Sequence, residues 1–97
     1  MSDFVLSPEA PLDLLNIWEY IAQDNIDAAD RVVGDIRNAM AALAQNPGIG
    51  NYCKDLADEP LRFWRVYTYL IIYRSESKPI EIVRVLSAYR DIRKLLD

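Results

Sequence analysis

Apolar residues recur at three- and four-residue spacing in two consecutive stretches of the N-terminal half, which predicts two amphipathic helices. The first begins at Ser7-Pro8-Glu9, where Ser7 is suited to cap a helix and Pro8 to occupy its first position. The second follows Asp24-Asn25, with Asp27 as the expected cap, and ends at Asn46-Pro47-Gly48. The short connection predicts an antiparallel hairpin. The apolar positions are Leu12, Leu14, Leu15, Ile17, Trp18, Ile21 and Ala22, and then Ala29, Val33, Ile36, Met40 and Leu43.

The C-terminal half is rich in β-branched and aromatic residues, which favour strands. Strands are predicted over 61–67, 69–74 and 80–86, with a turn at 76–79. Residues 3–6 form a short first strand, 48–60 a loop, and 88–96 a short closing helix. The predicted fold is α+β, βααβββ, in one domain over 1–97: an N-terminal helical hairpin packed on a small antiparallel sheet.

The middle strand, Leu70-Ile71-Ile72-Tyr73, is apolar at odd and even positions alike. Both faces of this strand therefore require cover, whereas a sheet with one wet face alternates apolar and polar residues. The helical hairpin covers one face only. Either the final helix or a partner chain covers the other, and an uncovered patch of this kind would mark an interaction site.

Charge is divided sharply along the chain, although the net charge is only -4. Residues 1–60 contain three basic side chains and eleven acidic ones, whereas residues 61–97 contain eight basic and four acidic. This asymmetry predicts that an anionic partner meets the C-terminal half. The acids are expected to be solvated, on the wet faces of the helices or in the loop. They are Asp13, Glu19, Asp30 and Asp35 on the helices, and Asp55, Asp58 and Glu59 in the loop.

Several kinds of chemistry are disfavoured by composition. The chain has no histidine, which removes the commonest general base, and its one cysteine, Cys53, cannot form an internal disulfide. The three glycines are scattered and build no phosphate-binding loop. We therefore expect no cofactor and no metal. No apolar stretch is long enough to cross a bilayer, and we expect a cytoplasmic protein without membrane contact.

Several short motifs follow one another along the chain. They are Ser7-Pro8-Glu9-Ala10, Asp13-Leu14, Ile17-Trp18-Glu19-Tyr20-Ile21, Ala28-Ala29-Asp30-Arg31, Asn46-Pro47-Gly48-Ile49-Gly50, Leu61-Arg62, Tyr69-Leu70-Ile71-Ile72-Tyr73-Arg74 and Ile82-Val83-Arg84-Val85-Leu86, with Arg90-Asp91 before the closing helix. Their order resembles the ParE branch of the ParE/RelE toxins, over nearly the whole chain. Two departures stand out: Ser87-Ala88-Tyr89 replaces a His-Gly-type pair, and Tyr67-Thr68 replaces a glycine turn.

The resemblance implies the same βααβββ fold and a toxin of a type II toxin–antitoxin system, associated with plasmid stabilisation and growth inhibition. It implies a ParD-like antitoxin with a ribbon-helix-helix part, whose C-terminal segment folds around the toxin in a hetero-oligomer. The implied target is DNA gyrase, inhibited by binding and without sequence-specific DNA contact by the toxin. RelE-like relatives instead cut messenger RNA on the ribosome and usually use a tyrosine near the C-terminus, which the tail Arg93-Lys94-Leu95-Leu96-Asp97 lacks.

Arginine and aromatic side chains are typical of macromolecular interfaces, so they supply the candidate site residues. No catalytic or metal-binding residue is assigned. Two alternatives stay open: a ribosome-dependent endoribonuclease using Arg65, Arg84 and Arg90 on phosphate, and an inactive toxin fold that keeps only an interaction role. The expected target-binding residues are Arg62, Arg65, Arg84, Arg90 and Arg93. The expected antitoxin-binding residues are Trp18, Phe63, Trp64, Tyr67, Tyr69, Ile71 and Tyr73.

Overall fold

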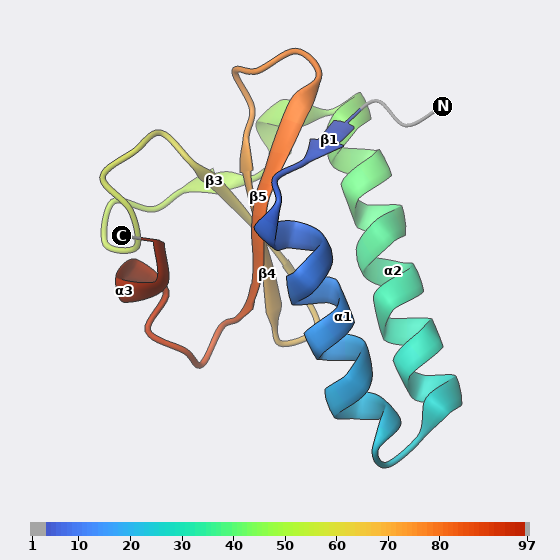
Figure 1. Ribbon diagram of the computed structural model, residues 1–97. Coiled ribbons are helices and arrows are strands. Elements are labelled where there is room, and N and C mark those ends of the chain that lie inside the picture. The colour runs from blue at the N-terminus through green and yellow to red at the C-terminus, as the bar shows by residue number, and fades with distance from the viewer. Residues whose placement is uncertain (1–3, 97) are drawn as a thin grey trace.

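A computed structural model describes residues 4–96 (Figure 1). Asp3, expected in the first strand, lies outside the described residues. The predicted helical hairpin and the strands are all present, and two short elements occupy the predicted loop. In order, the elements are β1 (Phe4–Leu6), α1 (Glu9–Ala22), α2 (Ile26–Gln45), the 3-10 turn η1 (Pro47–Ile49), β2 (Asn51–Tyr52), β3 (Arg62–Val66), β4 (Tyr69–Arg74), β5 (Ile80–Ser87) and α3 (Ile92–Leu96).

The strands form one sheet in the order β1-β5-β4-β3-β2. Neighbours are antiparallel except β1, which runs parallel to β5 and pairs with it from Ile80 to Ile82. The sheet is therefore mixed, whereas a purely antiparallel sheet was expected. The N–H of Ser7 extends this pairing by donating to the Ile82 carbonyl at 2.9 Å, and the chain then turns away into α1.

The helix starts are fixed by local hydrogen bonds. The Ser7 hydroxyl accepts from the Ala10 N–H at 3.3 Å and donates to the Val83 carbonyl at 2.5 Å, which ties the start of α1 to the sheet. In α2 the cap is Asn25 and not Asp27: the Asn25 side chain accepts from the Ala28 N–H at 2.9 Å. Asn25 has the extended backbone (φ -161°, ψ 109°) that a capping residue needs, whereas Asp27 already lies in the first helical turn.

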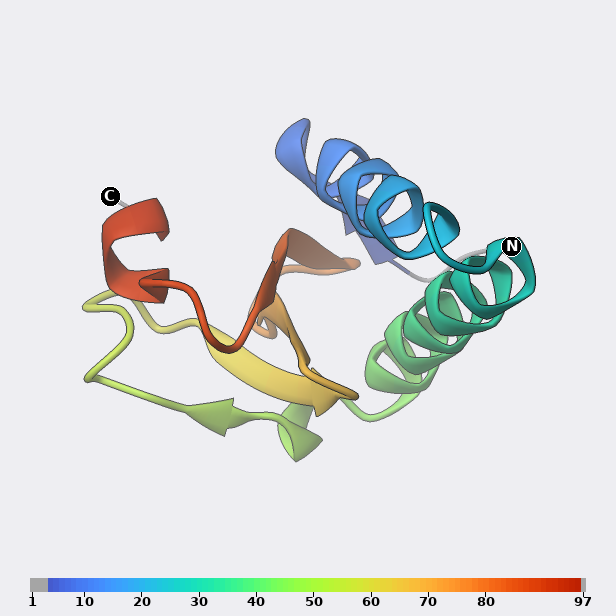
Figure 2. The same cartoon turned by 90° about the horizontal axis from the view of Figure 1, so that it is seen from below.

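Both faces of the sheet are covered by the chain itself. Figure 2 shows the helical hairpin on one side of the sheet and α3 on the other. On the hairpin side, Ile71 and Tyr73 of β4 are completely buried together with residues of α1 and α2. On the other side, Ile72 is completely buried in a cluster with Leu61 and with Ile92 of α3. Of the two possibilities left open for the second face of β4, cover by the chain itself is therefore the one realised.

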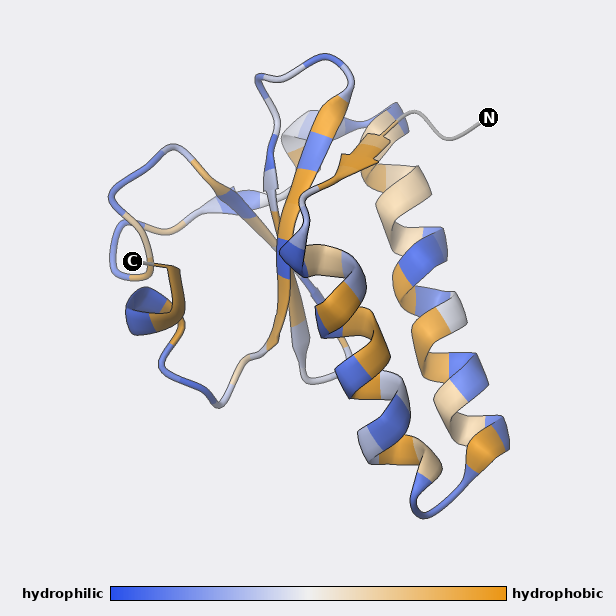
Figure 3. Ribbon diagram, in the orientation of Figure 1, coloured by the Kyte–Doolittle hydropathy of each residue, from blue (hydrophilic) through white to orange (hydrophobic). Residues whose placement is uncertain are grey.

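The hydropathy of the ribbon follows this arrangement, because the hydrophobic segments of β5 lie between α1 and α3 (Figure 3).

The closing helix is shorter than predicted. The Ala88 N–H donates to the Thr68 carbonyl at 2.7 Å and the Arg90 N–H to the Ser87 carbonyl at 3.1 Å, so these two N–H groups bond the β3–β4 turn and the end of β5. Within residues 4–96, no helix has the length and apolar character needed to cross a membrane.

Candidate functional site

A groove of about 500 Å³ opens between α1 and the end of the sheet where β3 turns into β4, and we call it the tyrosine groove. The strands meet there because Val66 pairs with Tyr69 and Tyr69 with Ser87. Three tyrosines and one arginine dominate its rim. The lining residues are Asp13, Asn16, Ile17 and Tyr20 of α1, Thr68 and Tyr69, Val85, Leu86 and Ser87 of β5, and Tyr89 and Arg90 beyond it.

The rim of the groove is accessible. Tyr20 and Tyr89 are 72% and 81% exposed, values that are unusual for large aromatic side chains and typical of contact surfaces. Tyr69 is half-buried: burial raises the pKa of Tyr69, and the neighbouring Tyr20 raises it further. Arg90 is exposed, and the ion pairs of residues 4–96 do not include it. The groove therefore presents aromatic rings and a guanidinium to an incoming partner.

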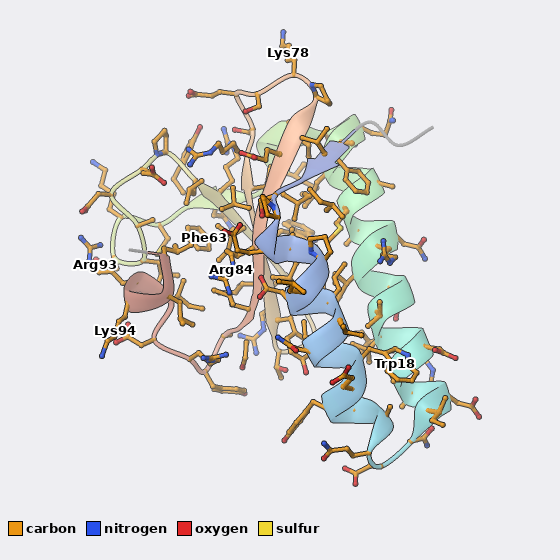
Figure 4. The ribbon with its side chains drawn as sticks, in the orientation of Figure 1. Trp18, Phe63, Lys78, Arg84, Arg93 and Lys94 are labelled. Atoms are coloured by element: carbon orange, nitrogen blue, oxygen red, sulfur yellow. The ribbon has the colours of Figure 1, made fainter. Side chains whose placement is uncertain are left out.

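Arg84, an expected target-binding residue, is half-buried and paired within the chain. Its Nε and Nη2 donate to the two carboxylate oxygens of Asp13 at 2.8 and 2.9 Å, and the same carboxylate accepts from the Val85 N–H at 3.0 Å. The hydrogen bond with Asp13 raises the pKa of Arg84. Figure 4 shows Arg84 on the α3 side of β5, where it also reaches the Leu95 carbonyl at 3.4 Å. The expectation of a solvated Asp13 is wrong, because Asp13 is buried and paired with Arg84.

Other arginines of the basic half also meet partners within the chain. Arg62 donates to Ser75 at 2.9 Å and to the Gly50 carbonyl at 2.7 Å, and its guanidinium lies 4.1 Å from the centre of the Tyr52 ring. Arg93 pairs with Asp58 at 2.6 Å. In the same way Arg74 pairs with Glu59 at 3.2 Å and with Glu81 at 3.3 Å. The loop acids, expected to be only solvated, thus neutralise part of the basic half, and Arg62 and Arg93 are held in place.

Arg65 is the expected target-binding residue on β3 that stays exposed. Its Nε donates to the Tyr67 carbonyl at 2.7 Å, which ties it to the β3–β4 turn. Tyr67 has a positive φ of 56°, a conformation that costs a non-glycine residue energy and occurs preferentially where function requires it. The Tyr67 hydroxyl donates to the Asp35 carboxylate on α2, and this hydrogen bond raises the pKa of Tyr67.

The aromatic and apolar candidates for antitoxin contact divide into two groups. Ile71 and Tyr73 are completely buried and Phe63 is 6% exposed, so these three residues belong to the core. The expectation that they lie on a contact surface is wrong. Tyr73 instead anchors η1: its hydroxyl donates to the Pro47 carbonyl at 2.7 Å and accepts from the Gly50 N–H at 2.9 Å. Burial raises the pKa of Tyr73.

The remaining candidates keep some accessible surface. Trp18 and Trp64 are half-buried, and the Trp18 indole donates to Asp30 at 2.8 Å across the helical hairpin (Figure 4). Tyr67 is 52% exposed at the turn, and Tyr69 lines the groove. A second hollow, of about 370 Å³, lies on the other face of the sheet between β3 and the loop, where it is lined by residues such as Cys53, Trp64 and Arg65.

Tyr20 was missed among the sequence candidates, although it occupies a prominent place on the groove rim. It follows Ile17 by three positions on the same helix, and this spacing predicts that the two side chains lie on the same side of α1. Its neighbours across the groove, Tyr69 and Tyr89, come from the other half of the chain. Their meeting depends on how α1 packs on β5, which periodicity does not specify.

Comparison with known families agrees with this fold. Residues 4–92 match the family model described as the ParE toxin of the type II toxin-antitoxin system, parDE. The chain therefore belongs to the ParE toxin family. Curated relatives named Toxin ParE1, from two strains of Mycobacterium tuberculosis, are 28% identical over 97 residues and cover 98% of either chain. A solved structure described as the chromosomal ParDE TA system from P. aeruginosa matches the fold with a TM-score of 0.70. That match covers 90% of this chain and 96% of the other at 22% identity.

Proposed function

We propose that this ParE-family toxin arrests growth by binding and inhibiting DNA gyrase, and that a ParD-like antitoxin neutralises it by forming a hetero-oligomer. The observation that carries the proposal is the family match over residues 4–92. Gyrase as target follows from the likeness to ParE toxins as a class. The exposed tyrosines and arginines at one end of the sheet support a mechanism based on macromolecular contact.

The arrangement of the arginines favours binding over RNA cleavage. A nuclease that stabilises a developing phosphorane with arginine needs those guanidinium groups directed at the substrate. Of the three residues named for that role, Arg84 is committed to the Asp13 carboxylate in a bidentate pair. Arg65 and Arg90 remain exposed. Their exposure is compatible with contact to a target protein, or to DNA that is bound by the target protein.

The toxin surface proposed to contact gyrase is the end of the sheet that carries Arg65 and Arg90. Arg65 lies one residue before the end of β3, and Arg90 follows the end of β5 by three residues. The register brings these strand ends together through Val66, Tyr69 and Ser87. Two arginines at one end suit contact with an anionic surface, where Arg forms planar paired hydrogen bonds.

The experiment is a supercoiling assay with purified gyrase and the purified toxin. We expect inhibition by the parent chain and a marked loss of inhibition in the double variant Arg65→Ala/Arg90→Ala. The matched control is Lys54→Ala/Lys78→Ala, which removes the same charge from exposed positions elsewhere and should inhibit like the parent. Undisturbed supercoiling with the parent chain would remove gyrase as the target. Mapping of messenger RNA ends after induced expression tests the nuclease alternative, because cleaved messages would establish it.

A further inference from the structure

The outer edge of β5 is open beside the tyrosine groove. Within the described chain, β1 pairs with β5 only from Ile80 to Ile82, so the last residues of β5 extend past it. The Val85 N–H points away from β4, because it donates to the Asp13 carboxylate at 3.0 Å. Alternate residues of an antiparallel ladder face the same side, so the N–H and C=O of Ser87 also point away from β4. The Ser87 carbonyl accepts from the Arg90 N–H at 3.1 Å, which leaves the Ser87 N–H directed to the groove.

The charges of the groove indicate what kind of group complements it. Asp13 is the one carboxylate in the lining, and it is neutralised by Arg84. Arg90 is the one cation in the lining, and the ion pairs among residues 4–96 do not include it. The groove therefore has an uncompensated positive charge at its mouth. A carboxylate is the side chain that pairs best with guanidinium in that position.

An extended peptide satisfies all of these features together. Its main-chain carbonyl can accept from the Ser87 N–H, as in peptides that add to a sheet edge. One acidic side chain can pair with Arg90, and a neighbouring apolar side chain can lie against Tyr20 and Tyr89. A nucleic acid fits less well, because Arg90 is the one cation in the lining, whereas a phosphate backbone is held by several cations.

We infer that the tyrosine groove binds an extended segment of the antitoxin that carries an acidic residue beside an apolar one. This inference rests on the proposed function, because it takes the antitoxin as the partner. It also gives neutralisation a physical route. The segment covers Arg90, one of the two arginines proposed to face gyrase, so that antitoxin and target compete for the same end of the sheet.

The test uses the full toxin chain and its purified ParD-like antitoxin. The affinity of Arg90→Glu for the antitoxin is expected to fall by at least about tenfold, because the variant places like charges together. Lys78→Glu is the matched control: it reverses an exposed charge in the β4–β5 turn, far from the groove (Figure 4), and should bind like the parent. In parallel, amide exchange of the labelled toxin should show slowed exchange of the Ser87 N–H in the complex. Melting temperatures of both variants establish that they are folded.

The outcomes separate the inference from the proposed function. A stable complex in which Arg90→Glu binds like the parent and the Ser87 N–H exchanges as in the free toxin would overturn the groove while leaving the antitoxin as partner. Failure of the parent chain to bind the antitoxin at all would overturn both. Resonance changes at Ser87 and Arg90 on adding single-stranded RNA, with none on adding the antitoxin, would also overturn the inference, because the groove would then be a nucleic-acid site.

Discussion

Replacing Asp13 by alanine removes the one carboxylate that joins α1 to the centre of β5. That carboxylate accepts from Arg84 Nε at 2.8 Å, from Arg84 Nη2 at 2.9 Å and from the Val85 N–H at 3.0 Å. The Asp13 side chain is 8% exposed and that of Arg84 is 23% exposed. Removing one partner of a buried ion pair costs about 3–5 kcal/mol, because the other charge stays behind without compensation. The partial exposure of Arg84 places the expected loss near the lower end, about 3 kcal/mol.

A loss of this size is a large fraction of the roughly 5–15 kcal/mol that stabilises a small domain. Urea unfolding followed by the fluorescence of Trp18 and Trp64 measures it directly. The partner variant Arg84→Met retains an apolar side chain of similar length without the charge. The double variant Asp13→Ala/Arg84→Met should be more stable than Asp13→Ala alone, because it removes the stranded guanidinium.

The double-mutant cycle decides whether the reasoning holds. A coupling free energy of about 0.5–3 kcal/mol between the two positions is expected of side chains in direct contact. Strictly additive effects would mean that the pair contributes nothing as a pair. An Asp13→Ala variant that unfolds at the urea concentration of the parent would refute the assignment of this carboxylate as the main polar link between α1 and β5.

Gly50→Ala should lower the free energy of unfolding by about 1–3 kcal/mol, because its Cβ would lie 2.8 Å from Cε1 of the buried Tyr73 ring, whereas the control Gly34→Ala, with open space around it, should stabilise α2 by up to about 1 kcal/mol in thermal denaturation. Tyr67→Gly should melt at a higher temperature than Tyr67→Phe, because both variants lose the bond to Asp35 but only glycine relieves the positive φ; equal melting temperatures would contradict a strained turn. Burial raises the pKa of Tyr69 and of Tyr73, so their contribution to stability is full below the unfolded value of about 10 and is lost as pH rises through the higher folded values. The urea midpoint should therefore decline in that alkaline range, and less steeply in Tyr73→Phe.

The elements that sequence periodicity located well are those whose cause is local. α1 and α2 follow from apolar spacing, although the cap of α2 was placed at Asp27 and is Asn25, and β4 was placed at 69–74, the bounds that the structure shows. β2 was missed because two residues, Asn51 and Tyr52, are too few to show an alternation. The start of α3 was placed too early because hydrogen bonds to the β3–β4 turn and to the end of β5 decide it, and such bonds leave no local pattern.

The candidate site was harder to predict, because its residues are assembled by tertiary contacts. The charge division along the chain predicted that an anionic partner meets the C-terminal half. In the folded molecule, Asp13 and Arg84 meet across a separation of 71 residues, and Asp58 meets Arg93 across 35. Composition shows how many charges of each sign exist but not which of them face each other. The burial of Ile71 and Tyr73 was missed for a similar reason, since a strand that is apolar on both faces looks the same whether its own chain or a partner covers it.

This internal pairing has a consequence for how an acidic protein can present a cationic surface. Acids from the first 60 residues neutralise Arg74, Arg84 and Arg93, so among the expected target-binding arginines Arg65 and Arg90 are the ones that are exposed and outside the ion pairs of residues 4–96. A surface with so few charges depends strongly on each of them, and its attraction for an anionic partner is screened at high salt. One acidic residue of a bound peptide beside Arg90 would offset about half of that charge. If the proposed function holds, one carboxylate at the mouth of the tyrosine groove would lower this positive charge without reversing it, so neutralisation would follow from blocking Arg90 and would not require the antitoxin to unfold the toxin or to cover the whole sheet.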